Sequence, residues 1–129
     1  MGDYAIRRML KQPFEAVLAR NPEALKNEGF GVLTEIDVKE TMKKKLNVDF
    51  RRYKILGACN PPFAHQALEA EIDIGVVMPC NIVVYEADGG DTVVAAIDPE
   101  RTMSAVGNPK LEPLAREMSQ KLRRVVAAL

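Results

Sequence analysis

CNIVVYEADGGDTVVAAI, residues 80–97, is the stretch that decides the fold. Two mainly apolar runs, residues 80–86 and 92–97, flank Asp88-Gly89-Gly90-Asp91, and glycine adopts the positive φ angles of a tight turn at no steric cost. This pattern predicts a β-hairpin. Apolar residues stand on both alternating sides of each run, so we expect helices or a second subunit to cover each face of the sheet.

The segment that follows the hairpin is predicted to be helical. Asp98-Pro99 is typical of the start of a short helix, which we expect to end near Gly107, and Asn108-Pro109 is typical of the start of the last helix. The apolar residues of that last helix recur at helical spacing, which predicts a stripe that packs on the sheet. The stripe consists of Leu111, Leu114, Ala115, Met118, Leu122, Val125, Val126 and Leu129.

Upstream of the hairpin, predicted strands alternate with predicted helices. The composition of residues 3–10, 30–36 and 53–59 favours strands, whereas residues 72–79 form an apolar connection whose structure the pattern leaves ambiguous. We therefore expect one α+β domain over residues 1–129, a two-layer α/β sandwich in which helices pack on a mixed, mostly antiparallel sheet.

Local signals mark where the upstream helices begin and where the first is interrupted. Asn21-Pro22 interrupts the first helix because proline removes the hydrogen bond to Leu18, so we expect either a kink or two short helices with Asn21 capping the second. Asp37 and Glu40 have the spacing of a capping box, which predicts a short helix. Asn60-Pro61 predicts the start of another helix directly after a strand.

The bulk composition is that of a soluble globular protein. Apolar residues make up 47% of the 129 residues and charged residues 28%. No apolar run approaches the roughly 20 residues that cross a bilayer, and Met1–Arg8 lacks the apolar core of a secretory signal. We therefore expect a cytoplasmic protein that does not insert into a membrane.

The charge balance favours no nucleic-acid or membrane partner. The chain contains eighteen Lys and Arg residues and eighteen Asp and Glu residues, so it has no net charge that would attract a polyanion. One basic cluster stands out, but no nucleic-acid motif frames it and cations near a helix end complement the helix dipole, so we interpret it as a solvated face. The cluster consists of Lys43, Lys44, Lys45, Arg51, Arg52 and Lys54.

The two cysteines have similar surroundings in the sequence. Cys59 and Cys80 lie 21 positions apart, and each is followed by Asn and has Pro close by. If their two runs are neighbouring strands, both thiols and the nearby His65 would converge on one spot. A chain without an export signal favours reduced thiols over a Cys59–Cys80 disulfide.

Three roles are open to the two cysteines. Free cysteine is among the most buried residue types and often only fills a core. Cys59 directly precedes a predicted helix N-terminus, which lowers a thiol pKa and suits redox or sulfur-carrier chemistry. Together with His65 the thiols are also possible zinc or copper ligands, with the fourth ligand from a partner, a water or Glu69. We favour packing, and we expect no metal site.

The other candidate chemistry around these segments is weaker. His65 is four residues before Glu69, which is the spacing of an exposed helical pair. An anion site at the helix start is disfavoured because Pro61 and Pro62 lack N–H groups and Asn60, as N-cap, would occupy the Phe63 N–H. The sequence contains no nucleophile elbow, phosphate loop or zinc-protease motif, so no catalytic residue or cofactor is predicted.

Three segments of the chain resemble the domain of unknown function 302 family. They are EGFGVLTEID at residues 28–37, ILGACNP at residues 55–61 and Pro79-Cys80-Asn81, and the similarity extends through nearly the whole chain in the order of its elements. The resemblance implies a small two-layer α/β domain from bacteria or archaea that forms a dimer, in a family associated with sulfur metabolism. It implies no catalytic role for any residue, and the Asn21-Pro22 interruption departs from the family pattern.

These observations favour an intracellular accessory domain that binds a ligand and has no turnover of its own. We expect it to be a homodimer with a cleft for a small molecule between the two cysteine segments. The expected cleft residues are Cys59, Asn60, His65, Cys80 and Asn81. The alternative is a thiol-based redox, sulfur-carrier or metal-binding protein that uses Cys59 and Cys80.

Overall fold

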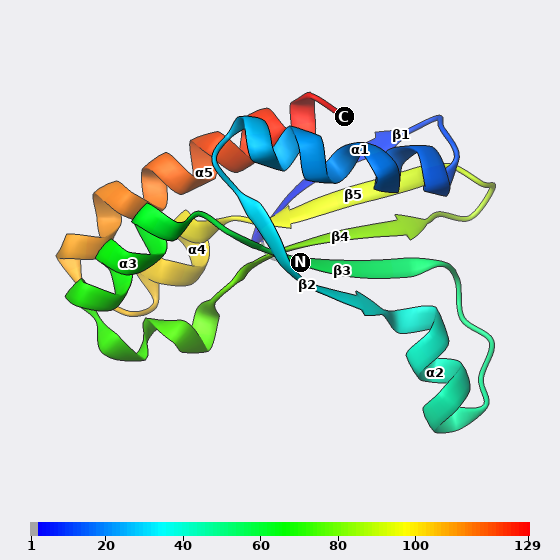
Figure 1. The fold of residues 1–129 in the computed structure, drawn as a ribbon, viewed down its shortest axis with the longest axis horizontal. Coiled ribbons are helices and arrows are strands. Elements are labelled where there is room, and N and C mark those ends of the chain that lie inside the picture. Colours follow the sequence, from blue (N-terminus) through cyan, green and yellow to red (C-terminus); the bar gives the residue numbers. More distant parts are fainter. Residues whose placement is uncertain (1–2) are drawn as a thin grey trace.

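The predicted hairpin lies at the centre of a five-stranded antiparallel sheet (Figure 1). The computed structural model describes residues 3–129. Met1 and Gly2, which belong to the segment Met1–Arg8 discussed above as lacking a secretory signal, lie outside the described residues. The strand order across the sheet is β1-β5-β4-β3-β2. The strands are β1 (Ala5–Leu10), β2 (Gly31–Asp37), β3 (Tyr53–Cys59), β4 (Cys80–Glu86) and β5 (Thr92–Ile97).

Apart from α2, the helices gather on one side of the sheet and at one of its ends. The two long helices, α1 and α5, lie side by side over the same face, and α3 and α4 lie at the end of the sheet where β3 ends and β4 begins (Figure 1). The short α2 stands away from the sheet on the side opposite α1. The helices are α1 (Phe14–Asn27), α2 (Val38–Leu46), α3 (Pro61–Ala70), α4 (Pro99–Ser104) and α5 (Glu112–Ala127), with 3-10 helices η1 (Ile72–Val77) and η2 (Pro109–Leu111).

The register gives the sheet one buried and one uncovered face. Ile82 pairs with Ala96 and Val84 with Val94, and all four are at most 1% exposed beneath α1 and α5. Because side chains alternate along a strand, their neighbours point to the other face, which no helix covers among the described residues. We call this the open face. Its side chains include Arg7, Met9, Ile36, Tyr53, Ile55, Val83, Tyr85 and Ala95.

The α+β sandwich predicted from the sequence is confirmed. The β4–β5 hairpin forms with positive φ at Gly89 and Gly90, and Asp37 caps α2 by accepting a hydrogen bond of 3.0 Å from the Glu40 N–H. Every strand pair among the described residues is antiparallel, whereas we expected a mixed sheet with some parallel pairing. The ambiguous connection after α3 contains η1.

The first helix passes through Asn21-Pro22 without a break. Of the two forms expected, the pair of short helices does not occur, because α1 is continuous from Phe14 to Asn27 with Pro22 inside it. The Asn21 side chain is fully buried, and its Nδ2 donates to the Val17 carbonyl at 2.8 Å instead of capping a second helix. Burial of this face against the sheet outweighs the lost backbone hydrogen bond.

Candidate functional site

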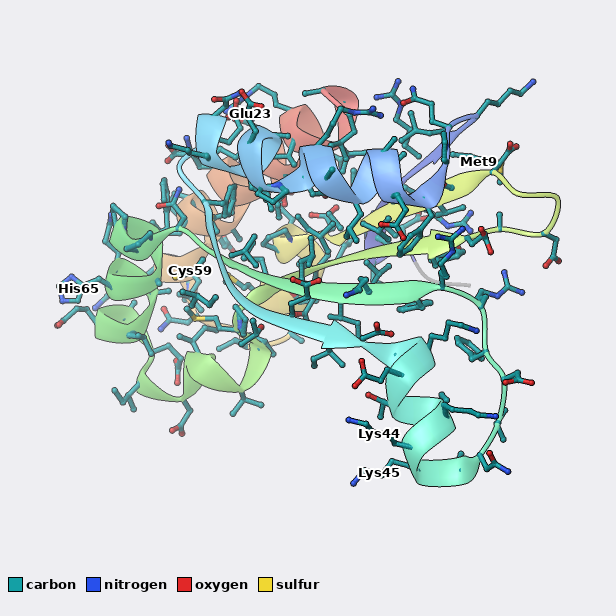
Figure 2. All side chains as sticks on the ribbon, turned by 45° about the vertical axis from the view of Figure 1, so that its right-hand side comes forward. Met9, Glu23, Lys44, Lys45, Cys59 and His65 are labelled. Atoms are coloured by element: carbon teal, nitrogen blue, oxygen red, sulfur yellow. The ribbon has the colours of Figure 1, made fainter. Side chains whose placement is uncertain are left out.

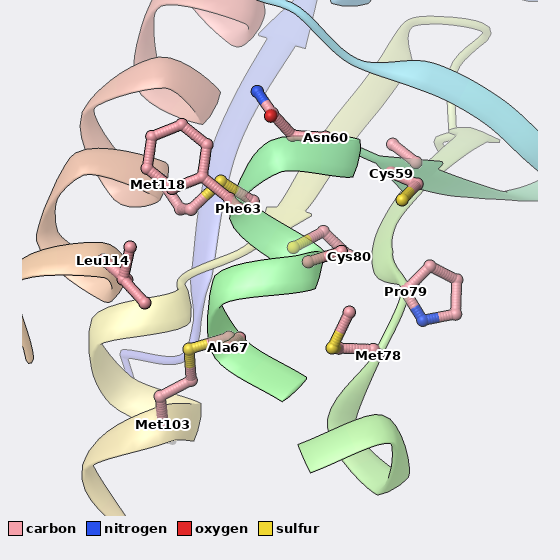
Figure 3. A pocket seen from close by; sticks show the side chains of 12 residues that line it. Cys59, Asn60, Phe63, Ala67, Met78, Pro79, Cys80, Met103, Leu114 and Met118 are labelled. Carbon is pink, nitrogen blue, oxygen red and sulfur yellow. The ribbon is translucent and has the colours of Figure 1, made fainter. Parts of the chain in front are cut away.

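Cys59 and Cys80 come near one another because their strands are neighbours. In the β3–β4 register Ala58 lies opposite Cys80, so Cys59, the last residue of β3, is one position away from the first residue of β4. Both residues line one small cavity of about 20 Å³ (Figure 3). A cavity of this volume holds one water molecule or one ion.

Three methionines complete a sulfur-rich lining. Met78 lies two residues before Cys80, whereas Met103 comes from α4 and Met118 from α5. Phe63, Ala64 and Ala67 of α3 contribute apolar atoms to the same lining. Apart from the Asn60 amide, the lining side chains carry no oxygen or nitrogen atom, so the cavity offers sulfur and carbon to an occupant.

The two thiols differ in exposure. Cys80 is 6% exposed and Cys59 is half-buried, and both are free. Burial raises the pKa of the Cys80 thiol to about 11, and the neighbouring Cys59 adds to this increase. Cys80 is therefore protonated at neutral pH while the cavity is empty of cations, and Cys59 is the thiol that solvent reaches.

Asn60 lies beside the cavity, but its side chain does not cap α3. The predicted hydrogen bond to the Phe63 N–H is wrong, since α3 has no side-chain cap. The Asn60 amide, 5% exposed, instead approaches the Glu28 carbonyl at 3.4 Å. A Cβ at Gly29 would come within 3.0 Å of Asn60 Nδ2, so packing against the turn after α1 sets the side-chain direction.

Comparison with known proteins supports the resemblance noted in the sequence. The model of the family described as "Domain of unknown function DUF302" matches residues 6–129. The chain belongs to this family. It is similar to the crystal structure of an uncharacterized conserved protein DUF302 from Bacillus stearothermophilus, with a TM-score of 0.90 and 28% identity over 98% of each chain. No protein with a curated description matches it.

His65 of this DUF302 chain lies away from the cavity. Its side chain is 76% exposed, and its Nε2 is 3.2 Å from Glu69 Oε1, as the helical spacing predicted. Figure 2 shows His65 on the outer side of α3, pointing away from Cys59. It borders a separate surface hollow that Lys110 and Glu117 also line. The convergence of His65 with the two thiols does not occur.

Asn81 also lies outside the cavity. It is exposed, and it pairs with Gly57 on the open face, because it follows Cys80 in the strand and therefore points to the opposite side. Of the five expected cleft residues, the structure brings Cys59, Asn60 and Cys80 together. No group of three or more His, Cys, Asp or Glu side chains in the described part of the chain is arranged to hold a metal ion.

The basic cluster of the DUF302 chain is largely engaged in ion pairs. Arg52 lies between Glu15 and Glu86 at 3.0 and 3.1 Å, and Lys54 is 2.9 Å from Glu35. Hydrogen bonding to Glu35 raises the Lys54 pKa. Three further pairs join Lys43 to Asp49, Lys44 to Glu40 and Arg51 to Asp88.

None of the helices in residues 3–129 is long and apolar enough to span a membrane.

Proposed function

We propose that this DUF302 chain is a homodimeric binding domain without turnover of its own, whose cavity between β3, β4 and α3 holds a small ligand. The observation that carries the proposal is the lining of that cavity. Two cysteines from neighbouring strands line the same space, and the other lining side chains are apolar except for Asn60. The lining includes no carboxylate, imidazole or amine that would act as a general acid or base.

The volume of the cavity limits its occupant. About 20 Å³ accommodates one heavy atom or one ion, whereas pockets for drug-sized molecules occupy roughly 300 to 1,000 Å³. The ligand is therefore a single atom or ion, or the narrow end of a larger molecule that enters past Cys59. This size argument favours binding over the processing of an organic substrate.

The open face of the sheet supports the homodimer. Five strands of six or seven residues present a face of roughly 500 Å², and its apolar side chains include Met9, Ile36 and Ile55. An aromatic row extends this face towards α2, with Tyr53 stacked on Tyr85 at 5.2 Å and Phe50 at 6.2 Å from Tyr53. A second copy is a self-complementary partner, because a two-fold interface joins the same surface of both subunits.

The α2 helix provides a second argument for a partner on this side. None of its nine residues is buried, and helices this short are marginal in water without tertiary contacts. Leu46 and Val48 at its end are 66% and 46% exposed. Because α2 projects from the sheet on the side of the open face (Figure 1), a partner docked there would contact it.

A thiol-based redox or sulfur-carrier role is the second candidate function. Cys59 favours it, because this thiol is half-buried at the rim while Cys80 lies beside it within the cavity. Against it stands the raised pKa of Cys80, which leaves that thiol unreactive at neutral pH.

Native mass spectrometry of the purified protein, before and after labelling with iodoacetamide, tests these proposals. We expect a dimer that carries an additional mass, and this mass should be absent from the Cys59→Ala/Cys80→Ala double variant. Met9→Leu is the control for the bound mass alone, because Met9 lies outside the cavity but on the open face. An adduct that persists in the double variant would place the ligand elsewhere. Rapid labelling of Cys59 with no bound mass would favour the redox or carrier role.

A further inference from the structure

We infer that the cavity is a site for a soft monovalent cation, Cu(I), held by Cys59 Sγ, Cys80 Sγ and Met78 Sδ. This inference rests on the proposed function, since it names the ligand class of the same cavity. The chain has two cysteines and six methionines, and both cysteines and three of the methionines line this one space. Five of its eight sulfur-bearing residues therefore surround a volume of about 20 Å³.

Packing alone accounts for buried methionines, which commonly fill irregular gaps in a core. Here, however, the residues that line the cavity leave a space large enough for one ion. Figure 3 shows the side chains of Cys59, Cys80 and Met78 on the β3–β4 side of this space, with Met103 and Met118 on the far side. Met78 and Cys80 lie on the same short segment that leads into β4, so one backbone segment presents two of the three donors.

The donor set distinguishes among metals. Thiolate and thioether sulfur select Cu(I) over Mg²⁺, Ca²⁺ and Mn²⁺, which require oxygen ligands. Structural zinc requires four ligands drawn mainly from Cys and His, and the described residues bring no third Cys, His, Asp or Glu to the two thiols. His65, the third ligand that the sequence suggested for zinc or copper, lies on the outer side of α3. A thioether in its place shifts the preference from zinc to Cu(I).

The binding step balances without an oxidant or reductant. Cu(I) forms bonds to two thiolates, the two thiol protons pass to solvent, and Met78 binds as a neutral donor, while copper remains Cu(I). The resulting site carries one net negative charge. Cys59 is half-buried, so part of this charge lies at the rim where water solvates it, and the same rim gives the ion a way in.

The test is an anaerobic titration of the reduced, metal-free protein with Cu(I) against a coloured Cu(I) chelator. We expect the wild type to retain one Cu(I) per chain, with thiolate-to-copper charge-transfer absorption, and to release protons as copper binds. Cys59→Ser should weaken the charge-transfer band, because one of the two thiolates is lost, and Met78→Leu should weaken Cu(I) binding by at least about tenfold. Met9→Leu, which removes an exposed thioether on the open face and outside the cavity, should bind Cu(I) like the wild type.

One readout needs no variant and therefore leaves the lining of the cavity unchanged. Bound Cu(I) should protect both thiols of the wild type from alkylation, whereas Zn²⁺ at the same concentration should not. The inference is overturned if the chelator removes all copper, if Met78→Leu binds as tightly as the wild type, or if Zn²⁺ protects the thiols better. If copper fails while the purified protein still carries a mass that the double cysteine variant lacks, the binding cavity stands and only its ligand class is wrong.

Discussion

The folded protein is more stable while the buried Cys80 thiol is protonated. It is 6% exposed, and burial raises its pKa from an ordinary value of 9.0 to about 11. Because the folded protein holds this proton more tightly than the unfolded chain, the thiol contributes about 2 to 3 kcal/mol that is present below about pH 9. We expect this contribution to disappear as the pH rises towards about 11, as denaturant unfolding at a series of pH values would measure.

The Cys80→Ala variant isolates this effect. Burial also raises the pKa of Tyr53, and the hydrogen bond to Glu35 raises that of Lys54, so both groups destabilise the fold in the same alkaline direction. The difference in unfolding free energy between wild type and Cys80→Ala should therefore shrink by about 2 to 3 kcal/mol between about pH 8 and about pH 11. In Cys59→Ala most of the pH dependence should remain, because burial is the larger cause. A constant difference would refute the assignment.

Helix α1 contains a buried side-chain oxygen, Asn21 Oδ1, that takes no part in the hydrogen bonds of the helix. Asn21 is fully buried, and its Oδ1 has no hydrogen-bond partner within residues 3–129. An unsatisfied buried carbonyl costs about 1 to 3 kcal/mol. We expect Asn21→Leu, which is similar in volume and favours helix, to raise the unfolding free energy by about 1 kcal/mol. Thermal and urea unfolding of the two proteins would measure the change.

Asn21→Asp is the matched opposite of this substitution. It retains the size of the side chain but buries a carboxylate without a cationic partner, so we expect it to destabilise the fold by several kcal/mol or to raise the pKa of the new carboxyl group. A stabilising Asp together with a destabilising Leu would mean that Oδ1 has a partner, such as a bound water, that the packing of α1 depends on.

Local sequence signals predicted the elements, and long-range packing decided the site. Asp37 with Glu40, and the two glycines of the β4–β5 turn, act within a few residues, so the helix start and the hairpin were predictable. The direction of Asn60 depends on Gly29, thirty-one positions earlier, and no local pattern carries that information. Met78 had a signal in its closeness to Cys80, whereas Met103 and Met118 belong to the stripes of distant helices, where a methionine facing a cavity and one filling a core look alike.

The open face of the sheet is the surface to which we expect a second copy of the chain to bind. Ile36 lies on this face and is 48% exposed. We expect Ile36→Lys to weaken dimerisation on the order of a hundredfold, because each interface would bury a charge without a partner. Sedimentation equilibrium across micromolar concentrations would show the wild type as a dimer and the variant shifted to monomer, with unchanged circular dichroism because the substituted side chain is outside the core.

Val76→Lys separates this face from exposed apolar surface in general. Val76 is 87% exposed on η1, beyond the end of the sheet, so a lysine there adds the same charge without entering the expected interface. The variant should dimerise like the wild type. If both lysine variants remain dimeric, the two copies bind through another surface, and the proposal that a second copy contacts α2 is wrong. If the wild type is monomeric, the proposed homodimer is wrong, and a search for another partner would begin with the aromatic row of Phe50, Tyr53 and Tyr85.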